Sequence, residues 1–294
     1  MCQMNWVKRL LIISIIMLVI TSMFLIAEVK GWSNGGFSAN PATPDYGTHD
    51  WIAERALDWL PVEEKQWLID NKAAYLYGTE LPDNNQAIDG IGDTTKHHVY
   101  YYPNGSVQDD VGAVRAKDEY TKALVALEMG NFSDAAKELG IMMHYISDMA
   151  VYGHVMGSHT FWGEELHHSD YENYIDTRTN SYQDIFNNFL VFDGNLTVIT
   201  AYEAALKLAY DSTFDGNSNL TCVWMDTHYN WNNSQFVNRA GESLNLAVNA
   251  VADILHTFYS RTVIPEFPSN LFLYWLLFLV LPFILFAKNK GLRY

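Results

Sequence analysis

The sequence predicts an all-α protein with a single multi-helix domain, and three observations favour this class. Apolar residues recur at helical spacing in several segments, and the chain shows neither a series of alternating strands nor an internal repeat. Of the 294 residues, 49% are hydrophobic and 18% are charged, which excludes a disordered chain. Two cysteines are too few for a disulfide-rich scaffold or a cysteine-based zinc finger.

The first helix is expected to begin at Thr48, which is a good N-cap residue, and to carry apolar residues on one face. A second helix follows Pro61, and a third ends before Gly130, a typical C-terminal cap. The predicted helices are residues 48–57, 63–69, 118–129, 132–152, 171–175, 199–210 and 236–259. Two segments rich in Gly, Pro, Asp and Asn, residues 33–47 and 83–95, are predicted loops.

The two ends of the chain differ from its middle. Residues 10–27 form an apolar run after two basic residues, so we expect residues 1–31 to be a secretory signal cleaved before Trp32, or an uncleaved signal anchor. Residues 271–287 form a second apolar run followed by three basic residues, which predicts a transmembrane helix with the middle of the chain outside the cell. The segment from Pro265 to the basic end resembles the sorting tails of archaeal surface proteins, which a sortase-like membrane enzyme processes.

These boundaries leave residues 32–264 as the functional domain, tethered at the cell surface. This domain has 12 basic and 32 acidic residues, a net charge of −20. Such a charge opposes the approach of a long polyanion, so no nucleic-acid partner is expected.

Histidines and carboxylates in the middle of the chain have the spacing of metal ligands. His144 and Asp148 are four residues apart, as are His168 and Glu172, so on a helix each pair shares one face. His154 follows the first pair, just beyond the expected helix end. Imidazole nitrogen and carboxylate oxygen together suit zinc. A satisfied core or surface histidine would explain one pair alone, but two pairs with His154 favour a metal site.

Further candidates precede these pairs. His49 stands at the start of the first helix, Asp83 lies in a predicted loop, and His97 and His98 precede a tyrosine-rich stretch. Each is a weak signal alone, but together they offer nitrogen and oxygen donors that converge if the helices pack as one domain.

The pattern of these residues resembles the bacterial zinc-dependent phospholipases C, which share a fold with fungal single-strand nucleases. The resemblance covers about Trp32 to Tyr259 and includes Trp32-Ser33, Thr48-His49-Asp50-Trp51-Ile52, the His-x3-Asp-x5-His of residues 144–154 and the His-Ser-x-Tyr-Glu-Asn of residues 168–173. The departures are a long segment between Trp32 and His49 and no further lipid-binding domain after the helices. Glu172 and the distance of His49 from Trp32 favour the phospholipases over the nucleases.

The resemblance implies a trinuclear zinc site that hydrolyses phospholipid to a phosphorylated head group and a diradylglycerol. The implied ligands are Asp83, His98, His144 and Asp148 for one zinc, His154, His168 and Glu172 for a second, and Trp32, His49 and Asp148 for a third. His97 competes with His98 for its place. Asp83 is the implied catalytic residue, which orients or deprotonates the attacking water. The alternatives are a single-strand nuclease and a surface zinc protein without catalysis.

Overall fold

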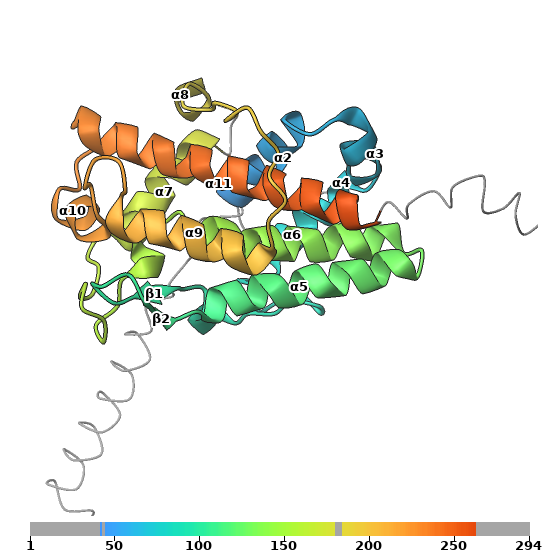
Figure 1. Ribbon diagram of the computed structural model, residues 1–294, viewed down its shortest axis with the longest axis horizontal. Coiled ribbons are helices and arrows are strands. Elements are labelled where there is room, and N and C mark those ends of the chain that lie inside the picture. Colours follow the sequence, from blue (N-terminus) through green and yellow to red (C-terminus); the bar gives the residue numbers. More distant parts are fainter. Residues whose placement is uncertain (1–41, 43–44, 180–183, 263–294) are drawn as a thin grey trace, which may run out of the picture.

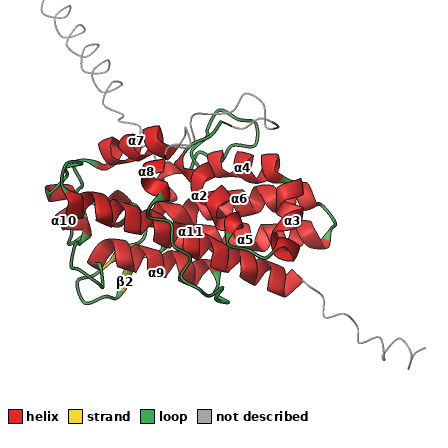
Figure 2. Ribbon diagram, turned by 90° about the horizontal axis from the view of Figure 1, so that it is seen from above, coloured by secondary structure: helices red, strands yellow, loops and turns green. Residues whose placement is uncertain are grey.

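Helices form most of the structure, a computed structural model that describes residues 42, 45–179 and 184–262. Figure 2 shows red helical ribbon throughout, with little strand. The elements in chain order are α2 (Thr48–Asp58), α3 (Val62–Asp70), α4 (Lys72–Glu80), η1 (Thr94–Lys96), β1 (Tyr100–Tyr101), β2 (Val107–Asp109), α5 (Val111–Glu128), α6 (Phe132–Asp148), η2 (Tyr152–Val155), α7 (His168–Thr179), α8 (Asp184–Asn187), α9 (Ala201–Phe214), α10 (Cys222–Thr227) and α11 (Ser234–Thr262). The prediction of a mostly helical single domain is confirmed.

Helix α6 occupies the centre of the bundle and carries two of the predicted ligands, His144 and Asp148, near its C-terminal end. Figure 1 shows α5 and α6 side by side, with α11 crossing the molecule above them. The α5–α6 turn passes through Gly130, whose φ of 75° is accessible to glycine at little cost. Helix α6 contacts α2, α4, α5, α9 and α11, so most of its surface is covered. The last three turns of α6 are therefore almost entirely buried.

Helices α4 and α6 cross at two glycines and approach very closely. A Cβ atom at Gly140 would lie 2.0 Å from the carbonyl oxygen of Tyr75, and one at Gly78 would lie 2.1 Å from the carbonyl oxygen of Lys137. No larger side chain fits this crossing unless the backbones move apart. The approach places the backbone of Thr79 against the C-terminal half of α6.

A loop segment, residues 191–199, lies along α11 and is held by hydrogen bonds to side chains of that helix. We call this segment the strap. Its backbone N–H groups donate to side-chain oxygens of α11 at distances of 2.7–3.2 Å, with Val191, Asp193, Thr197 and Ile199 as donors and Asn245, Asn249, Asp253 and Thr257 as acceptors. The acceptors are spaced by four residues, which is one helical turn each.

The structure differs from the sequence-based expectations at several element boundaries. Helix α5 begins at Val111, seven residues earlier than expected, and α6 ends at Asp148 rather than at residue 152. Helix α4, helix α10 and the antiparallel β1–β2 hairpin were not predicted. Trp32, the expected signal of residues 1–31 and the expected tail of residues 265–294 lie outside the described residues. Within the described residues, the helices are too short or too polar to cross a membrane.

Candidate metal centre

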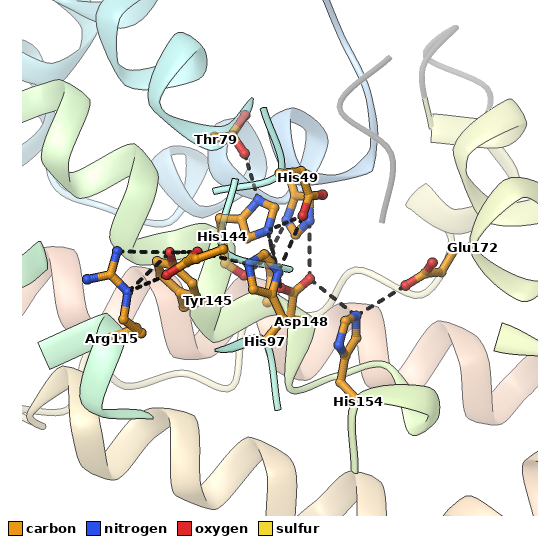
Figure 3. A network of polar contacts seen from close by, with 12 residues as sticks. His49, Thr79, His97, Arg115, His144, Tyr145, Asp148, His154 and Glu172 are labelled. Atoms are coloured by element: carbon orange, nitrogen blue, oxygen red, sulfur yellow. Dashed lines mark hydrogen bonds and ion pairs between the residues drawn. The ribbon is translucent and has the colours of Figure 1, made fainter. Parts of the chain in front are cut away.

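Asp148, the last residue of α6, has a fully buried carboxylate that faces four imidazoles. Its Oδ1 atom lies 3.3 Å from Nε2 of His49 and 3.7 Å from Nε2 of His154. Its Oδ2 atom lies 2.9 Å from Nδ1 of His97 and 3.2 Å from Nε2 of His144. Figure 3 shows Asp148 between the stacked imidazoles of α2 and α6 and the imidazole of η2. A carboxylate in this position can bridge metal ions on both of its sides.

The imidazole and carboxylate donors form three groups, and each group could hold a metal ion. Within each group the donor atoms lie within 4.8 Å of one another. The groups are His49, His144 and Asp148; Asp83, His97 and His144; and His154, His168 and Glu172. His144 belongs to two groups, and Asp148 contacts histidines of all three. The three groups are therefore parts of one cluster.

The third group joins η2 to the first turn of α7. Nε2 of His168 lies 2.8 Å from Oε1 of Glu172, one helical turn later, and Nε2 of His154 lies 3.3 Å from the same oxygen. A Cβ atom at Gly153 would lie 2.5 Å from the ring of His168. Glycine at this position therefore lets α7 approach η2 closely enough to complete the group.

His97, and not His98, joins Asp83 and His144. The ring of His98 stacks on Tyr100 at 4.2 Å, and its Nε2 atom lies 3.2 Å from Oδ2 of Asp109, in the hairpin. The two adjacent histidines therefore lie in different surroundings, and His97 is the one next to Asp148. The other predicted ligands in the described residues, namely His49, Asp83, His144, Asp148, His154, His168 and Glu172, all lie in the cluster.

Four of the imidazoles use one ring nitrogen for the cluster and the other for an outer partner. The outer pairs are His49 Nδ1 with Ser147 Oγ at 2.7 Å, His144 Nδ1 with the carbonyl oxygen of Thr79 at 2.7 Å, His168 Nδ1 with Glu165 Oε1 at 3.3 Å, and His97 Nε2 with Asp93 Oδ1 at 3.4 Å. Such outer partners fix the orientation of metal-binding histidines. The sequence analysis did not single out Asp93 or Glu165, because each becomes relevant only through the partner that the fold brings to it.

The electrostatics of the cluster shift the pKa values of its histidines in opposite directions. Burial and the neighbouring charge of His144 lower the pKa of His49 to about 4. Burial also acts to lower the pKa of His97, but the adjacent carboxylates of Asp148 and Asp93 outweigh that effect and raise this pKa to about 10. Burial acts to raise the pKa of Asp148, whereas the surrounding imidazoles, His144 foremost, hold it well below its usual range. A metal ion that binds here replaces the protons on such imidazoles.

Comparison with known proteins identifies the protein family of this chain. Residues 48–221, more than half of the chain, match the sequence model of a family described as zinc dependent phospholipase C. This chain belongs to the zinc-dependent phospholipase C family. A search of curated proteins found no match.

Two alpha-toxins of known structure share the fold of this zinc-dependent phospholipase C family member. The alpha-toxin of Clostridium absonum matches with a TM-score of 0.52 and 17% identity, over 78% of this chain and 66% of the toxin. The alpha-toxin of an avian strain of Clostridium perfringens matches with a TM-score of 0.52 and 16% identity, over 81% of this chain and 67% of the toxin. The chain thus spans about two thirds of the length of these toxins.

The donors of the cluster fit zinc, the metal of this phospholipase C family. Both oxygens of Asp148, Oδ1 of Asp83 and Nε2 of His154 are buried and make no hydrogen bond with the described residues. Buried polar atoms normally have a hydrogen-bond partner, and bound cations would take the place of such partners for these four atoms. Imidazole nitrogens with carboxylate oxygens are a usual donor set for zinc.

Proposed function

We propose that this protein is a zinc-dependent phospholipase C that hydrolyses the phosphodiester of a phospholipid on its glycerol side. The observation that carries this proposal is the convergence of four imidazoles on the buried Asp148 carboxylate beside the His154, His168 and Glu172 group. Membership of the family supports the reaction class. Release of a phosphorylated head group would leave a diradylglycerol in the lipid.

Three zinc ions are the proposed complement. Asp83, His97, His144 and Asp148 would hold the first zinc, and His154, His168 and Glu172 the second. His49 and Asp148 would hold the third zinc together with Trp32, whose amine becomes free if the chain is cleaved before it. Zinc bound here would act as a Lewis acid, stabilising negative charge on phosphoryl oxygens and making a nearby water more acidic.

Asp83 is the proposed proton acceptor for the attacking water. Its side chain is 13% exposed, whereas those of Asp148 and Glu172 are 0% and 3% exposed, so Asp83 is the carboxylate of the cluster that water reaches most easily. Burial raises its pKa above the usual value, with the charges of His144 and His97 opposing this effect. A carboxylate with a raised pKa accepts a proton more readily. Because Oδ1 faces His97 and His144 and would bind zinc, Oδ2 is the oxygen that would receive the proton.

Tethering at the cell surface is part of the proposal. A signal cleaved before Trp32 and an anchor within residues 265–294, whether or not a sortase-like enzyme later processes it, would keep the cluster close to lipid and raise its effective concentration there. Mass spectrometry of the mature N-terminus tests the cleavage. A mature chain that begins upstream of Trp32 would refute the assignment of its amine to zinc.

Hydrolysis by the zinc-loaded full chain tests the reaction. The chain would be incubated with phospholipid in mixed micelles and, separately, with single-stranded DNA and RNA. We expect phosphorylated head group in the first assay and intact nucleic acid in the second. Nucleotide release with untouched lipid would instead assign the protein to the nuclease type, and no turnover by the zinc-loaded chain would assign it a non-catalytic zinc-binding role.

A pair of variants tests the role of Asp83. Asp83→Asn should lower turnover by about 10²–10⁴-fold, the usual contribution of a general base. Asp89→Asn is the matched control, because Asp89 lies in the same loop and pairs with Tyr77 and Lys137 rather than with the cluster. The control should stay within about twofold of the wild type. Equal turnover in the two variants would remove Asp83 from the mechanism.

A further inference from the structure

The loop of residues 83–93 carries an aspartate at each end, and both aspartates approach His97. Asp83 Oδ1 lies 3.5 Å from Nδ1 of His97, and Asp93 Oδ1 lies 3.4 Å from Nε2 of the same ring. The two ends are tied together, because the backbone N–H of Asp93 donates to the carbonyl oxygen of Pro82 at 3.0 Å. Asp83 belongs to the cluster, whereas Asp93 stands on the far side of the imidazole.

The carboxylate of Asp93 is held by two further side chains. The hydroxyl of Tyr145 donates to Oδ1 at 2.6 Å, and Nε of Arg115 lies 3.0 Å from Oδ2. Arg115 also donates to the oxygen of Tyr145 and pairs with the buried Glu119 at 2.8 Å. Figure 3 shows Arg115 and Tyr145 together beside His97. Both Asp93 oxygens are engaged, so the carboxylate cannot rotate away from the imidazole.

His97 is turned differently from the other anchored histidines. His49, His144 and His168 direct Nε2 to the cluster and Nδ1 to an outer partner, whereas His97 directs Nδ1 to the cluster and Nε2 to Asp93. A neutral imidazole has one N–H and one lone pair. Donation of Nε2–H to Asp93 leaves the lone pair on Nδ1, the atom that lies 2.9 Å from Asp148 and 3.2 Å from His144 Nε2.

We propose that Asp93 is a positioning residue, which holds His97 as the Nε2–H tautomer so that Nδ1 binds zinc, with Tyr145 and Arg115 fixing the carboxylate. This inference rests on the proposed zinc site. It extends that site outward to α5, which carries Arg115 and Glu119. A purely structural role, in which the Asp93–Arg115 pair only closes the loop, makes a different prediction for metal binding.

Zinc affinity of the full chain, measured by competition with a chelator, separates the two roles. Asp93→Asn should lower the affinity of the most weakly bound zinc by about 10–100-fold, the usual effect of removing an outer carboxylate. Asp89→Asn removes a carboxylate from the same loop, where it pairs with a tyrosine hydroxyl and a cation but with no histidine, and should leave zinc affinity within about twofold. Tyr145→Phe, a milder change, should lower zinc affinity by an intermediate factor.

The visible absorption of the cobalt-substituted chain gives a second readout that loop closure alone would not move. Asp93→Asn and Tyr145→Phe should alter this spectrum, and Asp89→Asn should leave it as in the wild type. Wild-type zinc affinity and an unchanged cobalt spectrum in both Asp93→Asn and Tyr145→Phe would overturn the proposal. Hydrolysis is not measured in these experiments, so a wild-type chain that binds zinc tightly but leaves phospholipid intact would refute the proposed function and not this inference.

Discussion

Replacing Gly140 with alanine should force α4 away from α6 and disturb the metal cluster from outside it. The new Cβ atom would lie 2.0 Å from the carbonyl oxygen of Tyr75, whereas an ordinary contact between carbon and carbonyl oxygen is about 3.4 Å. The helices must therefore separate locally by more than about 1 Å. The distance from His144 Nδ1 to the carbonyl oxygen of Thr79 is 2.7 Å, and after this separation it would exceed the usual donor–acceptor distance of a hydrogen bond.

The expected cost follows from three contributions. Overpacking costs about 1–3 kcal/mol, and loss of the hydrogen bond at His144 costs about 1 kcal/mol. The better helix propensity of alanine offsets about 1 kcal/mol of this loss in stability. The free energy of unfolding should therefore fall by about 2 kcal/mol, and zinc affinity should fall by about tenfold because an outer partner is lost.

Urea denaturation of the metal-free chain and chelator competition with the zinc-loaded chain measure the two effects. Gly216→Ala is the control, because a Cβ atom at Gly216 would meet nothing within 4 Å. A Gly140→Ala chain with wild-type stability and wild-type zinc affinity would show that the close crossing does not position His144.

Two further predictions concern carboxylate side chains. Burial and the neighbouring Glu119 raise the pKa of Glu138 to about 7, so the folded chain keeps a proton that the unfolded chain releases, and stability should fall as the pH rises from about 4.5 to 7. Relative to Glu138→Gln, the wild type should lose about 2 kcal/mol of unfolding free energy across that pH window, after allowance for solvent screening. Urea denaturation of both proteins at several pH values measures this loss. The same pH dependence in the two proteins would contradict the prediction. Asp148→Asn should retain about one zinc per chain and Glu172→Gln about two, because Asp148 faces four imidazoles and Glu172 faces two. Elemental analysis of the dialysed proteins checks this, and equal zinc contents would remove the bridging role of Asp148.

Helical periodicity predicted the elements whose own sequence has an apolar face. Helix α6 is such an element, and the four-residue spacing of His144 and Asp148 placed both on its buried side. Helix α4 was missed because the sequence from Lys72 to Glu80 has no clear apolar stripe and includes Gly78, a poor helix former. This helix depends on its packing against α6, which is tertiary information.

The choice between His97 and His98 shows where residue types alone were insufficient. Val99, Tyr100 and Tyr101, which follow the two histidines, are all buried, so this segment shows no alternation that would separate His97 from His98. The choice depends on Asp148, which lies next to His97, and on Asp109 of the hairpin, which lies next to His98, and both contacts are tertiary information. The start of α5 was missed because Gly112 weakens the helical pattern. The close approach of His98 explains this glycine, because a Cβ atom there would lie 2.9 Å from the carbonyl oxygen of His98.

The strap along α11 constrains how this part of the chain can evolve. Two residues of extended chain advance about 6.6 Å and four residues of helix about 6.0 Å, so the two steps between Val191 and Asp193 and between Thr197 and Ile199 each match one turn of α11. The intervening residues turn at Gly194, whose φ is 92°, and absorb the difference in length. Insertions and deletions among relatives should therefore concentrate at residues 194–196, whereas the paired segments on either side should keep their length as strands do, although they belong to a loop.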